Sequence, residues 1–227
     1  MHTYSCSGTL GDTYINLCIL YNIAIKEAVL CKHYTVVPQW HSLIEQIYSL
    51  LPNIRVEFVS ERSTSHPRIH SAFSHQEKYG DEFTRPDEWC VLPEFVFPKT
   101  EIELPDRYTV MNPQSGKPKE NRHIEGKSIH EILKTSVDPV VVIGTEKKHK
   151  DILGANVINI VGKTSLLEAM SIVSKASHFC GFQGLMSFVA MSHRVQSDVY
   201  ARNESDIQAI FARMPERWKQ YCSIVRD

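Results

Sequence analysis

Four short segments of the sequence combine small and polar residues of the kind that bind phosphate or move a proton. The first runs from Ser7 through Gly8, Thr9, Leu10 and Gly11 to Asp12. Glycines there allow a tight turn and let a ligand approach backbone N–H groups at a helix N-terminus. The Asp12 carboxylate has the chemistry of a general base for an incoming hydroxyl. A helix cap explains an aspartate at this place equally well.

The second segment is a polar loop, residues 112–122, which follows a predicted strand. It offers hydrogen-bonding side chains and three cations, namely Asn112, Gln114, Ser115, Lys117, Lys119 and Arg122. Such a set suits a diphosphate, which arginine binds bidentately and lysine as a point charge. For any single cation, an ordinary solvated loop charge is the competing explanation.

The third segment, residues 161–168, contains Gly-Lys-Thr-Ser but is not a P-loop, because Val157 stands where that pattern needs a glycine. A strand-to-helix turn remains, with Thr164 or Ser165 as N-cap and Glu168 completing a capping box. Capping is the structural interpretation. Binding of an anion by Lys163 and the exposed N–H groups is the functional one.

The fourth segment, residues 181–190, begins with a glycine-rich turn before an apolar helix. It places Gln183, Gly184 and Ser187 at a helix N-terminus that is able to meet a phosphate or sugar hydroxyls. Small residues at such turns also serve packing, so this segment by itself is a weak signal.

These segments lie between alternating strands and helices, which predict an α/β fold with parallel sheets. We expect strands near residues 2–6, 33–37 and 54–59, then an irregular stretch to about 104, then strands at 107–112, 139–144, 157–161, 178–181 and 197–201. A terminal helix carries Ile207 to Trp218, with a kink at Pro215. The chain therefore divides into Rossmann-like lobes at 1–104 and 105–227. We expect the lobes to face each other across a cleft and to bind a ligand at the carboxyl ends of their strands, with the terminal helix crossing back.

Composition excludes several classes of protein. The 227 residues carry a net charge of −1 and are 42% hydrophobic, so no global positive field holds nucleic acid. No apolar run approaches the roughly 20 residues of a membrane span, and the N-terminus lacks a signal-peptide pattern. Six scattered cysteines indicate reduced thiols of a cytoplasmic protein. We expect no cysteine-based zinc and no metal, and surface loop polarity accounts best for His66, His70 and His75 near Asp81.

The order of these segments resembles glycosyltransferase family 9, the heptosyltransferase-like family with the two-domain GT-B fold. The stretch ending in Gly11-Asp12, the strand 140–144 followed by Thr145 and the stretch 159–168 are similar to elements of that family. The stretch 174–187 stands in the place of its donor-binding turn. It has Phe182 and Ser187 where the family has aspartate and histidine.

The resemblance implies an inverting, metal-independent glycosyltransferase without a cofactor, whose co-substrate is a nucleotide sugar. Asp12 would be the general base, with Gly11 and Thr13 on the acceptor side. The acceptor would be a surface saccharide or a hydroxymethylated base in DNA. The donor-binding residues would be Asn112, Gln114, Ser115, Lys119, Arg122, Thr145, Lys163, Thr164, Ser165, Gln183, Gly184 and Ser187.

Two alternatives stay open. A nucleotide-sugar epimerase would need a second acid/base residue, for which the sequence offers no convincing candidate. A non-catalytic module that binds a nucleotide or glycan is favoured by the replacements at Phe182 and Ser187. Loss of turnover on substitution of Asp12, with nucleotide affinity retained, would distinguish a transferase from a binder.

Overall fold

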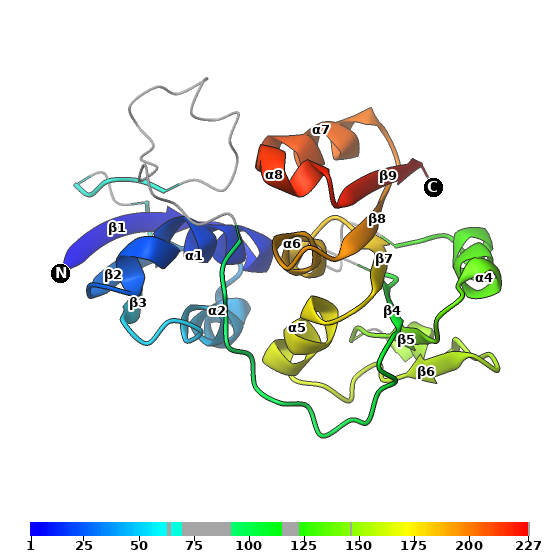
Figure 1. Cartoon of the computed structure of the whole chain (residues 1–227). Helices are drawn as coiled ribbons and strands as arrows, with labels where there is room; N and C mark the ends of the chain where they lie inside the picture. Colours follow the sequence, from blue (N-terminus) through cyan, green and yellow to red (C-terminus); the bar gives the residue numbers. More distant parts are fainter. Residues whose placement is uncertain (63–64, 70–91, 115–122, 146, 227) are drawn as a thin grey trace. The chain divides into compact units, whose positions relative to one another are not determined.

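The computed structural model describes residues 1–62, 65–69, 92–114, 123–145 and 147–226 (Figure 1). The chain forms two units, each built around a parallel β-sheet. The first comprises Met1–Val96 with Phe211–Arg217, and the second comprises Phe97–Ile210 with Trp218–Asp227. Within the described residues, no helix has the length and apolar character that would let it cross a bilayer.

The first unit has the predicted β-α-β-α-β order, and its three strands lie side by side as β1-β2-β3, all parallel. Residues 67–69 extend the sheet beyond β1, because the Ser5 N–H donates to the Pro67 carbonyl at 2.9 Å and the Ile69 N–H to the Ser5 carbonyl at 2.9 Å. The elements are β1 (His2–Ser7), α1 (Leu10–Ala24), β2 (Val29–Tyr34), η1 (Pro38–Trp40), α2 (His41–Tyr48) and β3 (Ile54–Phe58).

Helix α1 is the core of this unit. Residues 13–20 are all buried, so the helix is enclosed on every side instead of showing one apolar stripe. Phe95 contributes to this enclosure, since its ring lies 5.6 Å from the ring of Tyr14 and 5.4 Å from that of Tyr21. A helix buried all round holds the turn that precedes it in a fixed place.

The second unit is a six-stranded parallel sheet in the order β6-β5-β4-β7-β8-β9. The chain starts in the middle at β4, runs to one edge, returns to the middle at β7 and runs to the other edge, which is the doubly wound Rossmann order. Its elements are β4 (Thr109–Asn112), α4 (Gly126–Thr135), β5 (Val140–Val142), η4 (Lys147–Asp151), β6 (Val157–Asn159), α5 (Leu166–Ser174), β7 (His178–Phe182), α6 (Leu185–Ser192), β8 (Gln196–Ala201), α7 (Glu204–Arg213), α8 (Glu216–Lys219) and β9 (Cys222–Arg226).

Helices cover both faces of this sheet (Figure 1). Side chains alternate between the faces along each strand. One set packs under α4 and the other lies toward α5 and α6. The buried residues on the α4 side are Met111, Ile124, Ile132, Val140, Val142, Val161, Cys180, Phe182 and Tyr200.

The C-terminal region differs from the prediction. The expected kinked helix is two helices, with α7 ending at Arg213 before Pro215, and the chain then adds a sixth strand, β9, that the sequence analysis missed. The sequence analysis predicts no element after the terminal helix, because these five residues are too few to show a period of their own, and pairing with β8 supplies the partners that make them a strand.

The main segment of the first unit ends at Val96 and that of the second begins at Phe97, whereas the sequence pattern predicts the division at residue 104. Aromatic contacts explain the position. Phe95 packs on rings of α1, whereas the Phe97 ring lies 5.4 Å from the ring of His193 in the second unit. Residues 97–104 are irregular, so their sequence carries no period that assigns them to either sheet.

Candidate functional site

The turn between β1 and α1 depends on Gly8. This residue has φ +125°, and a Cβ there would overlap the Asp12 side chain. Two contacts hold the turn, since the Gly8 N–H donates to the Tyr34 carbonyl at 3.1 Å and the Asn16 amide donates to the Ser7 carbonyl at 3.3 Å. The turn thus closes tightly around the start of α1.

Asp12 lies in the first turn of α1 and is held by Thr9. Its Oδ2 accepts a hydrogen bond from the Thr9 N–H at 2.9 Å and one from the Thr9 hydroxyl at 3.1 Å. These contacts cap the helix, and a negative charge at this end also complements the helix dipole. The capping interpretation therefore has direct geometric support, and the same contacts fix the orientation of the carboxylate.

His33 supports this turn from β2. Its Nε2 lies 3.3 Å from the Gly8 carbonyl oxygen and its Nδ1 3.1 Å from the Tyr48 hydroxyl. A carbonyl only accepts, so Nε2 carries the proton and Nδ1 accepts from Tyr48. Burial lowers the pKa of His33 to about 4, although the Gly8 carbonyl and the Asp12 charge favour the protonated form. A neutral imidazole therefore holds the turn at physiological pH.

The two residues expected on the acceptor side, Gly11 and Thr13, are both in the first turn of α1. Thr13 is fully buried and its hydroxyl donates to the Thr9 carbonyl at 2.9 Å. Gly11 is half-buried. Thr13 thus stabilises the helix start, and Asp12 supplies the ionisable group of the turn.

In the second unit, the carboxyl ends of β4 and β7 lie side by side at the centre of the sheet. Asn112 ends β4 and pairs in register with Gly181, and Gln183 and Gly184 follow β7 directly. Asn112 and Gln183 are 9% and 8% exposed, so both side chains are held in place by their surroundings. The strand order reverses between β4 and β7, and open α/β sheets bind ligands outside the carboxyl ends at such a point.

Helix α6 begins at this point, with Gly184 as its N-cap residue. The Gly184 N–H donates to the Ser187 hydroxyl at 3.0 Å, and that hydroxyl donates to the Gly184 carbonyl at 2.9 Å. Ser187 is fully buried, so it shapes the turn. The first turn of α6 contains no acidic residue, so the helix itself supplies no negative charge to the positive end of its dipole.

The residues expected after β5 and β6 lie further along the same edge. Gly144 and Gly162 have φ of +138° and +73°, and the Gly162 N–H donates to the Gly144 carbonyl at 2.8 Å, which joins the two strand ends. Thr145 and Lys163 are exposed. Because β5 and β4 lie between β6 and β7, a strand spacing of about 4.8 Å separates the ends of β6 and β7 by about 14 Å.

The capping box predicted at the start of α5 is confirmed. Ser165 is the N-cap residue, its hydroxyl accepts from the Glu168 N–H at 3.3 Å, and Glu168 Oε2 accepts from the Ser165 N–H at 2.8 Å. These bonds hold the pKa of Glu168 below its ordinary value, so the carboxylate is charged at neutral pH. Unlike α6, α5 therefore begins with a negative charge. Thr164 is half-buried beside this cap.

Some expected site residues lie outside the described residues, namely Ser115, Lys117, Lys119, Arg122, His70, His75 and Asp81. The two ends of the polar loop are described. Gln114 pairs with His123 in an isolated antiparallel bridge, and the Ile124 N–H donates to the Pro113 carbonyl at 2.8 Å. The loop that carries the predicted cations therefore starts and ends next to Asn112. His66 is half-buried.

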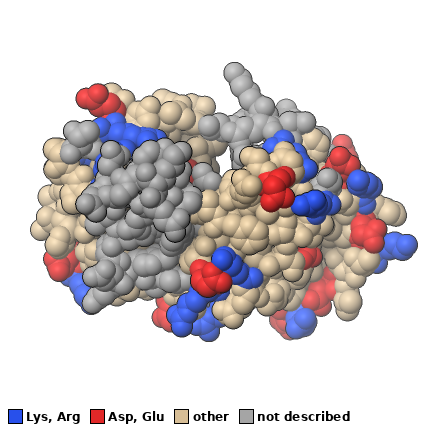
Figure 2. Space-filling view, turned by 90° about the horizontal axis from the view of Figure 1, so that it is seen from above, with Lys and Arg blue, Asp and Glu red and all other residues tan. Residues whose placement is uncertain are grey.

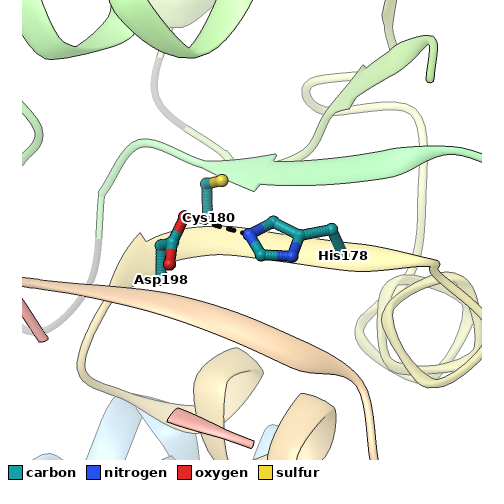
Figure 3. Close-up of side chains that lie close together, drawn as sticks. All are labelled: His178, Cys180 and Asp198. Carbon is teal, nitrogen blue, oxygen red and sulfur yellow. Dashed lines mark hydrogen bonds and ion pairs between the residues drawn. The ribbon is translucent and has the colours of Figure 1, made fainter. Parts of the chain in front are cut away.

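Three side chains of types that can ligate a metal, which the sequence did not indicate as a group, lie together in the described part of the chain: His178, Cys180 and Asp198 on β7 and β8 (Figure 3). His178 Nε2 lies 3.0 Å from Asp198 Oδ2. Burial, and then the Asp198 charge, raise the pKa of Cys180 to about 12, so this residue is a thiol and not a nucleophilic thiolate at neutral pH. The His-x-Cys spacing on one strand face was visible in the sequence, but Asp198 joins it only through the pairing of Cys180 with Asp198.

The five described cysteines, Cys6, Cys18, Cys31, Cys180 and Cys222, are free thiols, as expected for reduced residues. Figure 2 shows Lys and Arg side chains interspersed with Asp and Glu side chains over the described part of the face it displays. Ion pairs between the two kinds of charge occur among the described residues, for example Arg202 with Asp206 at 2.9 Å. This pattern agrees with the near-zero net charge of the sequence.

No protein-family model matches the sequence, and a search of curated proteins finds no match. Solved structures do match. The chain is similar to Escherichia coli ADP-heptose lipopolysaccharide heptosyltransferase II, with a TM-score of 0.58, 9% identity and coverage of 99% of this chain and 90% of that one. It is also similar to the E. coli heptosyltransferase WaaC with ADP, with a TM-score of 0.54, 10% identity and coverage of 100% and 93%.

A glycosyltransferase family 9 protein from Veillonella parvula matches with a TM-score of 0.54, 9% identity and coverage of 99% of this chain and 86% of that one. The chain spans only 58% of the iron-containing dodecameric glycosyltransferase TibC from enterotoxigenic E. coli, at 15% identity and a TM-score of 0.49. At identities of 9–10%, the likeness to the family 9 structures with TM-scores of 0.54–0.58 shows a common fold alone. The two parallel-sheet units of this chain therefore have the GT-B fold of the family 9 heptosyltransferases, as the sequence resemblance implied.

Proposed function

We propose that the protein is a glycosyltransferase that moves a sugar from a nucleotide-sugar donor to a hydroxyl acceptor. The observation that carries the proposal is the edge of the second sheet where β4 and β7 end, with Asn112, Gln183 and the start of α6 gathered at the reversal of strand order. The shared fold supports it, and one of the structures with that fold is described as a heptosyltransferase with ADP.

In this proposal the second unit binds the diphosphate of the donor. The N–H groups in the first turn of α6 have no intrahelical acceptor, and the helix dipole favours an anion there. Asn112, which pairs in register with Gly181, would supply an amide at the same strand ends, and Lys119 and Arg122 belong to the loop that starts and ends next to it. Thr145, Lys163, Thr164 and Ser165 lie along the same edge and would contact more distant parts of the donor.

Asp12 of the first unit is the proposed general base. It takes the proton from the acceptor hydroxyl while that oxygen forms a bond to the anomeric carbon. The bond from the anomeric carbon to the diphosphate breaks with inversion, and its electron pair passes to the departing phosphate oxygen. Negative charge grows on the diphosphate during this step, so fixed donors at α6 contribute to rate as well as to binding. We propose a saccharide acceptor, and DNA carrying a hydroxymethylated base is the alternative.

A second candidate function follows from the cap. Because the Asp12 carboxylate is bound by both donors of Thr9, the turn also suits a module that binds a nucleotide or glycan without turnover. The transferase and a nucleotide-binding module both require a nucleotide, so the first measurement is binding. A nucleotide or nucleotide sugar that binds the native state raises the melting temperature by mass action. Failure of UDP, GDP, ADP, CMP and their common sugars to do so would rule out the donor site, and with it the transferase and the nucleotide-binding module.

The substitution Asp12→Asn separates the two candidates once a donor is known. The amide keeps an oxygen that accepts from Thr9 but has no basicity, so transfer should fall by about 100-fold or more while nucleotide affinity stays within about twofold. The control is Glu57→Gln, which neutralises an exposed carboxylate on β3 of the same unit and should leave both unchanged. Turnover that survives in Asp12→Asn would contradict the assignment of the base.

A further inference from the structure

Three side chains with different metal-binding atoms meet on one face of the second sheet (Figure 3). His178 and Cys180 are two residues apart on β7, so they project to the same side. Cys180 pairs in register with Asp198 of β8, which brings the carboxylate to the same face. One ligand atom from each residue lies within 4.8 Å of the other two.

The spacing of these atoms fits a single small cation. Around a tetrahedral zinc ion, ligand atoms at bond lengths of 2.0–2.3 Å are separated from each other by about 3.3–3.6 Å. His178 Nε2 and Asp198 Oδ2 are already 3.0 Å apart. Side-chain rotations that move the ligand atoms by less than about 1 Å would bring all three to the separations of a tetrahedral zinc site. Thiolate with imidazole favours zinc over magnesium or calcium, which prefer oxygen ligands.

The cluster is also accessible. A pocket of about 410 Å³ opens over the same sheet face beside the C-terminal end of α4, and His178, Cys180 and Asp198 all line it. Tyr200 and Thr109 are among the other lining residues, so polar groups surround the opening. An ion held by three protein ligands in such a pocket keeps a fourth position for water or another small ligand.

We propose that His178, Cys180 and Asp198 bind one zinc ion, with His178 Nε2, Cys180 Sγ and one Asp198 oxygen as ligands. Binding releases the thiol proton to solvent and replaces the hydrogen bond between His178 and Asp198 with bonds to the metal. The site is separate from the proposed donor site, because Cys180 lies within β7 whereas Gly184 follows its carboxyl end. The proposal departs from the expectation of a protein without cysteine-based zinc, and it does not depend on glycosyl transfer.

The test is titration of the full-length protein, stripped with a chelator and kept reduced, with Co²⁺ as a spectroscopic substitute for Zn²⁺. We expect one Co²⁺ per chain, a charge-transfer absorption from thiolate to cobalt, the intense visible bands of tetrahedral coordination, and displacement by Zn²⁺. Cys180→Ser should lose the charge-transfer band. Asp198→Asn, which is nearly isosteric, should weaken Co²⁺ binding by at least about tenfold, since even the loss of an outer-shell partner has that effect.

The matched control is Cys222→Ser, which removes a half-buried thiol of β9 that is not in the cluster. It should retain both the band and the affinity. Circular dichroism of each variant shows whether it is folded. If Cys180→Ser does not fold, the Co²⁺ affinity of Asp198→Asn tests the proposed site. Absence of stoichiometric Co²⁺ binding, a band that persists in Cys180→Ser, full affinity in Asp198→Asn, or a band lost in Cys222→Ser would each overturn the assignment.

Discussion

The turns that begin α1 and α6 are both capped by a side chain of the first helical turn, but that side chain is charged in α1 and neutral in α6. Each follows a strand of a parallel sheet, and in each a side chain in the first helical turn bonds back to the residue at the cap. In α1 the returning side chain is the Asp12 carboxylate, which accepts from Thr9. In α6 it is the neutral Ser187 hydroxyl, which binds Gly184.

The difference assigns different chemistry to the two turns. A carboxylate at a helix N-terminus cancels the positive end of the dipole and repels an anionic ligand. A hydroxyl caps the backbone without a charge, so the dipole remains available to a diphosphate. The α1 turn therefore suits a proton acceptor and the α6 turn suits an anion. By the same argument α5, which starts with the charged Glu168, is a poorer phosphate site than α6.

The largest change in stability should come from Gly8→Ala. The residue has φ +125° and its new Cβ would overlap the Asp12 side chain, so backbone strain adds to a steric clash at about 3 kcal/mol in total. Chemical denaturation measures the loss. Gly126→Ala is the matched control, because a Cβ at Gly126 meets nothing within 4 Å, and it should change the free energy of unfolding by less than about 1 kcal/mol. Equal effects of the two substitutions would show that Asp12 is not packed against Gly8.

A comparable effect is expected from pH at the α1 turn. The pKa of His33 is about 4 in the native protein and 6.5 for an unperturbed histidine. Between pH 6.5 and pH 4, His33 binds a proton in the unfolded chain but stays neutral in the native protein. The free energy of unfolding should therefore fall as the pH drops from 6.5 to 4, by up to about 3 kcal/mol from this residue, and the His33 contribution should level off below pH 4.

Denaturant titrations at several pH values in the wild type and in His33→Gln measure this contribution. The variant lacks the titrating group, so its stability should change less with pH over the same window. Parallel curves for the two proteins would mean that native His33 takes up its proton at the ordinary pKa, and that burial does not keep the imidazole neutral below pH 6.5.

The smallest expected effect is a change in nucleotide affinity when α6 is given a charged first turn like that of α1. Met186→Glu places a carboxylate in the first turn of α6, which otherwise has none. The new charge should weaken the binding of a nucleotide diphosphate by about two- to fivefold, corresponding to 0.3–1 kcal/mol, while leaving the free energy of unfolding equal or slightly higher. Met186→Gln controls for size and should bind normally. If Met186→Glu binds as well as the wild type, the diphosphate does not lie at α6.

Local patterns in the sequence predict much of this architecture. The alternation of strands and helices predicts parallel sheets, and the parallel pairing among β1 to β3 and among β4 to β8 confirms it. Ser165 with Glu168 marks a capping box that forms. Gly8 and Gly184 likewise mark turns between a strand and a helix. These features depend on residues within a few positions of each other, so the chain's own spacing is sufficient to identify them.

Other features depend on which strands pair in the tertiary structure. Residues 222–226 are a strand because β8 supplies their hydrogen-bond partners, and Asp198 joins His178 and Cys180 because of the register between β7 and β8. The order of the strands likewise separates Lys163 from Gly184, although both follow strands in similar sequence contexts. Strand order and register are set by contacts between residues far apart in the chain, and a single sequence carries no period that reports them.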